Sequence, residues 1–161
     1  IEFFSNVHVN PFNNNISSFT KNNYQILYVE YLLWENKEYN KSLILKIASH
    51  NENLLNIIEY ILSTLDEIES FEFENSIIQK ISIPNSIELI GIGAFYESEK
   101  LTEVIIPSSV IEIRNKAFCH CYSLQKIVLS PSIKFIDNYA FSQCMSLKQI
   151  IIPSSVTHIF L

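Results

Sequence analysis

The stretch LTEVIIPSSVIEIRNKAFCHCYS, at positions 101–123, sets the pattern for the second half of the chain. Phe118 in this stretch recurs at one fixed spacing, as Phe95 before it and as Phe141 after it, each time directly after an alanine. Other apolar columns keep the same spacing: Ile78, Leu101, Leu124 and Leu147; Ile81, Val104, Ile127 and Ile150; Ile83, Ile106, Leu129 and Ile152. A fixed period of roughly 20–50 residues is typical of a solenoid, in which stacked units supply one another's core.

Within one unit, the order of residues predicts a short strand, a bend and a compact turn. Val104 and Ile106 alternate with outward residues, and Pro107 ends the strand because it has no N–H for the ladder. Val110 and Ile113 lie three apart, which predicts an inward-facing bend or a second short strand. The Ala-Phe pair then opens a helical turn that closes over the core. We therefore expect the phenylalanines to stack as an internal ladder.

This unit resembles the BspA-like leucine-rich repeat family, whose repeats follow Leu-x-x-Ile-x-Ile-Pro-x-Ser-Val-x-x-Ile-Gly-x-x-Ala-Phe-x-x-Cys-x-x. Matching residues are Ile81, Ile83, Pro84, Ser86, Ile87, Ile90, Gly91, Ala94 and Phe95 in the first copy, and Ile150, Ile152, Pro153, Ser155, Val156 and Ile159 in the last. Arg114 and Asp137 replace a glycine of the pattern, and Ser98 replaces its cysteine. The resemblance covers about residues 68–161. It implies a non-enzymatic binding or adhesion protein exposed at the cell surface.

We therefore expect an α+β chain with two parts. Residues 1–67 are predicted to form a mainly helical module with a loose lead-in, and residues 68–161 a leucine-rich-repeat solenoid with 23-residue coils and a short-stranded parallel sheet. A degenerate first coil, 68–77, precedes coils that start near residues 78, 101, 124 and 147. Because the chain begins at Ile1 and stops within a repeat, we expect it to be a piece of a longer protein.

The N-terminal part predicts one short strand and three helices. The strand is expected near Phe3 to Val9, and the helices over Tyr24–Trp34, Lys41–Ser49 and a third stretch that ends at about Leu65. Residues 45–53 followed by 57–62 are faintly similar to an ankyrin helix pair, although a glutamate stands at the usual turn glycine.

The segment that follows these helices changes to an alternating pattern. Ile68, Phe71 and Phe73 copy the spacing of Leu101, Val104 and Ile106, so we align them as the strand of the degenerate first coil. A shortened terminal unit is typical of a solenoid cap.

Cys121 and Cys144 occupy the same position of two successive units. We interpret them as buried thiols, because this position requires a small side chain. Coils about 4.8 Å apart would also permit a disulfide between them. With three cysteines in all, the chain has no disulfide framework.

The composition argues against several classes of function. The net charge is −6 and no basic stripe is present, whereas nucleic-acid binding needs cations to neutralise phosphates. No run of about 18 apolar residues is present, so we expect no membrane span. Cys119, His120 and Cys121 are metal-ligand types, but zinc sites usually draw four ligands from two separated pairs, and no second pair exists. Without a nucleophile motif or glycine-rich phosphate loop, we expect neither catalysis nor a cofactor.

Two outward columns of the predicted strands carry the candidate contact surface. One is charged or polar and the other mostly aliphatic: Lys80, Glu103, Lys126 and Gln149; Ser82, Ile105, Val128 and Ile151. The aliphatic column has two open interpretations. It is a recognition stripe for a host or self protein, or it reflects strand preference and is covered by another part of a longer chain. The second interpretation fits a structural spacer or a regulatory repeat region whose activity lies elsewhere.

Overall fold

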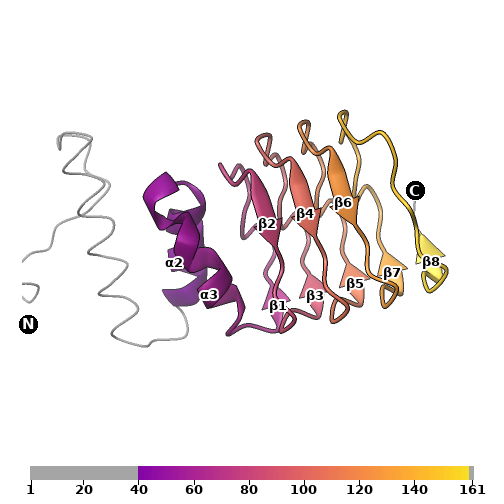
Figure 1. Ribbon diagram of the computed structural model, residues 1–161, viewed down its shortest axis with the longest axis horizontal. Helices are drawn as coiled ribbons and strands as arrows, with labels where there is room; N and C mark the ends of the chain where they lie inside the picture. The colour runs from indigo at the N-terminus through magenta and orange to yellow at the C-terminus, as the bar shows by residue number, and fades with distance from the viewer. Residues whose placement is uncertain (1–39, 160–161) are drawn as a thin grey trace, which may run out of the picture. The chain divides into compact units, whose positions relative to one another are not determined.

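The computed structural model describes residues 40–159 of the chain (Figure 1). The chain divides into two compact units, residues 1–44 and residues 45–161. The strand predicted near Phe3 to Val9 and the helix predicted over Tyr24–Trp34 lie outside the described residues. The helical module over residues 1–67 therefore stays a prediction as a whole, and so does the domain division at residue 68.

Three helical segments open the described part of the chain. Helix α2 runs over Asn40–Ser49, a 3-10 helix, η1, over Glu52–Ile57, and helix α3 over Ile58–Leu62. The helix predicted to end at about Leu65 thus ends earlier, at Leu62. The hydroxyls of Ser63 and Thr64 donate back to the carbonyls of Tyr60 and Ile61, at 2.6 and 2.7 Å. Such local side-chain bonds compete with the helical ladder and favour its end.

The remainder is a solenoid of short parallel strands arranged in two sheets (Figure 1). One sheet has the order β1-β3-β5-β7-β8 and the other β2-β4-β6. Every pairing is parallel and in register along the repeat. The second strand of each unit, one of the two predicted options, is therefore confirmed. The strands are β1 Glu67–Ile68, β2 Lys80–Ser82, β3 Leu89–Ile90, β4 Glu103–Ile105, β5 Glu112–Ile113, β6 Lys126–Val128, β7 Phe135–Ile136 and β8 His158–Ile159.

The predicted phenylalanine ladder runs through the core. The ring of Phe95 stacks on that of Phe118 with centroids 5.1 Å apart, and Phe118 stacks on Phe141 at 5.5 Å. Phe73 adds a fourth ring, 5.0 Å from Phe95. The backbone follows the same stack, because the N–H of Phe95 donates to the carbonyl of Ala117 in the next coil at 2.7 Å. An alanine precedes Phe95, Phe118 and Phe141 and lets their coils approach this closely.

The alignment predicted for residues 68–73 is wrong. Ile68 pairs with Ile90 in the five-stranded sheet, so it corresponds to Ile113 and not to Leu101. Phe73 belongs to the ring ladder and not to a strand. The error arose because two apolar residues at positions i and i+2 are compatible with a strand and also with a turn that places one of them in the core. In addition, the step from Ile68 to Ile90 is one residue shorter than the step from Ile90 to Ile113.

Candidate binding surface on the three-stranded sheet

The structure brings the predicted outward columns together on the sheet of β2, β4 and β6. Lys80 lies beside Glu103, and Glu103 beside Lys126, in the register of the two parallel pairs. In the second column Ser82 lies beside Ile105, and Ile105 beside Val128. The sequence prediction of two stacked columns is confirmed for these three strands.

The charged column is an ion-pair network centred on Glu103. The ammonium of Lys126 lies 2.5 Å from one carboxylate oxygen, and the ammonium of Lys80 lies 3.3 Å from the other. The hydrogen bonds from Lys126 and then Lys80 hold the pKa of the Glu103 carboxyl below its usual value. The network has two cations and one anion, so this column presents a net charge of +1.

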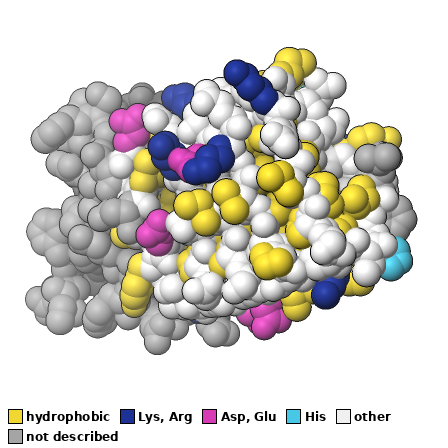
Figure 2. Space-filling view, turned by 45° about the vertical axis from the view of Figure 1, so that its right-hand side comes forward, with side chains coloured by type: hydrophobic (Ala, Val, Ile, Leu, Met, Phe, Trp, Pro, Cys, Tyr) yellow, Lys and Arg dark blue, Asp and Glu magenta, His cyan; other side chains and the backbone are white. Residues whose placement is uncertain are grey.

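The aliphatic column is half exposed. Ile105 and Val128 have 45% and 46% of their surface accessible, whereas the inward Val104 and Ile127 of the same strands are buried. The alternation of a strand explains this contrast, since successive side chains point to opposite faces. Figure 2 shows hydrophobic side chains dispersed over one face, next to a group in which basic and acidic side chains meet.

The fourth members of both columns do not join the sheet. Gln149 and Ile151 lie in a stretch, residues 147–157, that forms no strand. Both are exposed, Ile151 to 75%. The prediction that four residues of each column lie side by side is therefore wrong for the last copy. Strand β6 finds no partner there, although isoleucines favour strands.

A second outward surface was missed by the sequence analysis. On the five-stranded sheet the outward column contains Leu89, Glu112, Phe135 and His158 in register. The rings of Phe135 and His158 stack at 5.3 Å, and Phe135 is 41% exposed. These residues also follow the repeat spacing, so comparing equivalent positions of successive repeats would have identified this column. Its members share no chemical type, unlike the columns on β2, β4 and β6.

The cysteine position of the repeat is a hydrogen-bond ladder in the core. The thiol of Cys121 donates to the carbonyl of Phe95 and that of Cys144 to Phe118, both at 3.1 Å. Ser98 makes the equivalent bond to Phe73 at 2.6 Å. All three cysteines are free thiols. Burial raises the pKa of Cys121 well above its usual value and that of Cys144 to about 12.

The Cys-His-Cys sequence does not converge on one point. The thiol of Cys121 is directed to a core carbonyl, while Nδ1 of His120 lies 2.6 Å from the hydroxyl of Tyr122. Residues 40–159 contain no group of three or more histidine, cysteine, aspartate or glutamate side chains that could hold a metal ion. In the same range, no helix has the length and apolar character needed to cross a membrane.

A family model described as a BspA type leucine-rich repeat region, in six copies, matches residues 39–160. The match starts well before residue 68, where the sequence analysis placed the beginning of the resemblance, and it includes α2, η1 and α3. The structure gives a reason for this correction. Leu62 in α3 accepts a hydrogen bond from Ser86 of the following coil, as Ile133 does from Ser155. The segment formed by α2, η1 and α3, which we call the helical segment, therefore occupies the place of a coil.

Two solved structures of bacterial leucine-rich repeat proteins are similar to this chain. That of T. pallidum is 34% identical, with a TM-score of 0.57, and the alignment covers 58% of this chain and 44% of that chain. One from Bacteroides ovatus is 38% identical over 50% of this chain and 21% of its own length, with a TM-score of 0.47. The chain thus spans less than half of either protein. No curated protein sequence matches the chain. The stacked repeat and the match over residues 39–160 show that this chain belongs to the BspA-type leucine-rich repeat family.

Proposed function

We propose that the chain is a non-enzymatic protein-binding module and that the outward face of β2, β4 and β6 is its contact surface. One observation carries the proposal: Ile105 and Val128 lie side by side and half exposed on a parallel sheet, next to a fixed ion-pair network. Leucine-rich repeats of this family are typically protein-interaction modules. Adhesion at a cell surface, the role that the family resemblance implies, is part of the proposal.

The two aliphatic side chains provide an apolar centre but not a whole interface. Full burial of an exposed valine or isoleucine contributes about 1.5–3 kcal/mol, and about half of that area remains to be buried here. A specific interface covers about 800 Å² on each partner. The contact must therefore extend over neighbouring residues, for which we propose Lys80, Ser82, Glu103 and Lys126, with Gln149 and Ile151 beyond the sheet edge.

The charged column determines which charges a partner should carry. Lys80 and Lys126 share one carboxylate, so an incoming acidic group finds a cation that is only partly compensated. Rim charges of this kind affect mainly association rate and specificity. We therefore expect a partner with an apolar patch bordered by acidic residues, whose association slows as salt concentration rises.

The experiment compares two matched double variants of the full chain. Ile105→Asp with Val128→Lys alters the proposed surface, and Ile111→Asp with Phe135→Lys alters half-exposed side chains on the five-stranded side, where Ile111 is 43% and Phe135 41% exposed. Each chain is immobilised and exposed to a cell-surface extract, and retained proteins are identified by mass spectrometry. Circular dichroism first establishes that both variants fold.

We expect a protein that the unmodified chain and the Ile111/Phe135 variant retain and that the Ile105/Val128 variant loses. The physical reason is that an unpaired charge buried at the centre of an interface strongly weakens binding. The proposal is wrong if the Ile105/Val128 variant folds and still retains that protein, or if both variants lose it equally. Unfolding of the Ile105/Val128 variant alone would place its side chains in a core and would favour a spacer.

A further inference from the structure

The helical segment stands where the solenoid would otherwise have a strand beside β2. The N–H of Ile77 donates to the carbonyl of Ser49 at 2.9 Å, and the hydroxyl of Ser86 donates to the carbonyl of Leu62 at 3.0 Å. These two bonds hold the helical segment to the coil on either side of β2. Between them lie η1 and α3, whose backbone is helical and so forms no strand that could pair with β2.

Strand β2 lies at the edge of its sheet. The carbonyl of Gln79 accepts from Thr102 at 2.7 Å and the N–H of Ile83 donates to Ile105 at 3.0 Å, so both residues face β4. Because the backbone groups of a strand alternate in direction, those of Lys80 and Ser82 face the opposite way. Within residues 40–159 no strand pairs with this side of β2. Such an edge is a template for another strand.

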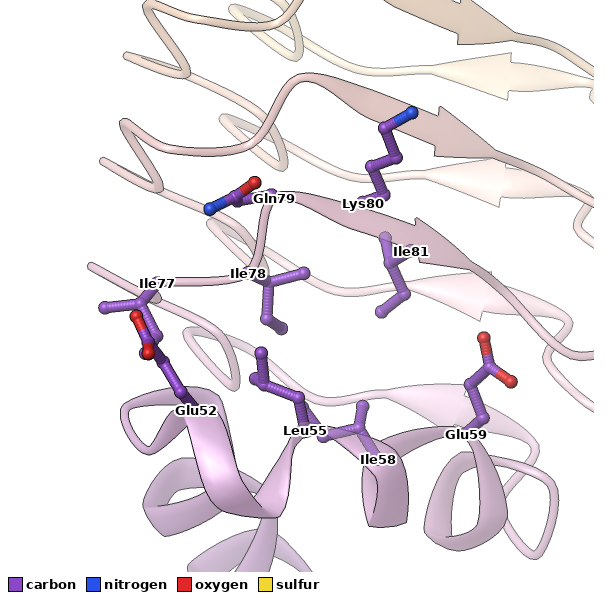
Figure 3. A pocket seen from close by; sticks show the side chains of 9 residues that line it. All are labelled: Glu52, Leu55, Ile58, Glu59, Ile77, Ile78, Gln79, Lys80 and Ile81. Carbon is purple, nitrogen blue, oxygen red and sulfur yellow. The ribbon is translucent and has the colours of Figure 1, made fainter.

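A groove runs between this part of β2 and the helical segment (Figure 3). Its volume is about 720 Å³, within the range of roughly 300–1,000 Å³ that is common for binding pockets. The half-buried side chains of Leu55 and Ile77 contribute apolar surface from the two sides, above the buried Ile58, Ile78 and Ile81. We call this space the β2 edge groove.

The charges around the β2 edge groove are mainly negative. Glu52 and Glu59 are exposed on the helical side. On the other side the single cation is Lys80, and its ammonium is held 3.3 Å from Glu103 on the sheet face. The groove therefore favours an occupant with a positive charge.

We infer that the β2 edge groove binds an extended peptide of a partner protein, which pairs with Lys80 and Ser82 as an added strand and places a basic side chain near Glu52 or Glu59. Strand addition fits because the N–H and C=O groups that face away from β4 recur at every second residue, which matches another main chain. The apolar side chains of the groove would cover one face of the peptide. This contact uses the edge of the sheet and is distinct from the proposed contact on its face.

The test uses the full chain and a synthetic peptide, LQKIVLS, that copies residues 124–130. This segment contains β6, which pairs with β4 in the same sheet, and it carries one lysine. Amide hydrogen exchange of Lys80 and Ser82 is followed by NMR with and without the peptide. We expect rapid exchange in the free chain and at least about tenfold slower exchange with saturating peptide. A scrambled peptide should give no change.

Two pairs of variants locate the contact. Ser82→Pro removes the edge N–H without touching the bonds to β4, and proline is tolerated on edge strands. It should weaken peptide binding about tenfold, whereas Ser82→Thr should keep it, because one lost hydrogen bond is worth roughly a factor of ten. Glu52→Lys with Glu59→Lys should weaken binding in a salt-dependent way, whereas Glu99→Lys, on an exposed turn, should not.

Three outcomes overturn the inference. The first is no binding at about 1 mM peptide, the weakest affinity of practical interest. The second is unchanged binding by a folded Ser82→Pro chain. The third is slow exchange of Lys80 and Ser82 in the free chain, which would show that the groove is already filled. Dependence of that protection on protein concentration would identify a second copy as the occupant, and independence would identify the chain itself. Loss of the face contact through Ile105→Asp and Val128→Lys should leave peptide binding intact.

Discussion

Two segments of the solenoid carry nearly the same residues and differ in burial. In the unit at 101–123, the core residues Ile106, Val110 and Ile113 are at most 3% exposed. Their counterparts Ile152 and Ile159 in the last described segment are 38% and 47% exposed. This contrast in exposure shows that a unit does not bury its own apolar face. Burial comes from the next coil, which the unit at 101–123 has on both sides.

The backbone shows the same dependence. Strand β4 is paired on both sides, by β2 and β6, whereas Gln149–Ile151 forms no strand despite the consecutive isoleucines at 150–152. Strand preference alone therefore does not make a strand here.

The largest expected effect is a difference in stability loss between a substitution in the middle of the phenylalanine ladder and one at its end. Phe118 is fully buried between Phe95 and Phe141, whereas Phe141 is half-buried with one stacking neighbour. Phe118→Ala should cost about 3–5 kcal/mol and Phe141→Ala about 1–2 kcal/mol. Thermal melts should show a decrease on the order of 10 °C for Phe118→Ala. Equal decreases in melting temperature for both variants would contradict the view that a covering coil supplies the burial.

The next effect uses equivalent strand residues. Ile113 in β5 is fully buried, and Ile159 in β8 is 47% exposed. We expect Ile113→Ala to lower the free energy of unfolding by about 2–4 kcal/mol and Ile159→Ala by less than about 1 kcal/mol. Urea unfolding monitored by circular dichroism measures both. A large loss for Ile159→Ala would mean that the last segment is packed more tightly than its exposure indicates.

The cysteine ladder provides a smaller effect with an internal control. Cys121→Ala removes both the bond to Phe95 and buried volume, and should cost about 1–2 kcal/mol. Cys121→Ser should cost less than about 1 kcal/mol, because Ser98 already makes this bond in the preceding coil. Urea unfolding of both variants under reducing conditions distinguishes them. If serine were as costly as alanine, packing and not the hydrogen bond would explain the cysteine.

The smallest effect concerns the ion-pair network. The folded pKa of Glu103 is lowered, so its contribution to stability is present above the unfolded pKa, near 4.3, and is lost as pH falls through the folded value. Glu103→Gln should therefore cause a slight loss of stability near neutral pH and almost none at low pH, and salt should reduce the difference. Melting temperatures from pH 3 to 7 measure it. A difference that grows at low pH would contradict the network.

The repeat made much of the fold predictable from sequence. Its columns fix which residues of neighbouring coils meet, so the stacking of Phe95, Phe118 and Phe141 and the pairing of Glu103 with Lys126 follow from spacing alone. The same logic failed where the spacing changes. The step from Ile68 to Ile90 is one residue short of the repeat, and that shift was enough to misalign the first coil.

The candidate surfaces were predictable only in part. Column chemistry indicated the outward face of β2, β4 and β6, but half-exposure of Ile105 and Val128 depends on neighbouring strands and is not visible in the sequence. The β2 edge groove was not predictable either. It depends on helix α3 forming where the other coils have a strand, although Leu55 and Ile58 keep the repeat spacing to Ile78 and Ile81.

Amide hydrogen exchange along the chain tests most directly whether burial is supplied by neighbouring coils. The N–H of Phe118 donates to Ala140 at 2.8 Å between stacked coils, and the N–H of Thr157 donates to Lys134 at 2.9 Å in the last segment. We predict that Phe118 exchanges only through global unfolding, and that Thr157 exchanges at least about a hundredfold faster through local opening. Equal protection at the two positions would contradict the account, because similar bonds would then be equally stable with and without a covering coil.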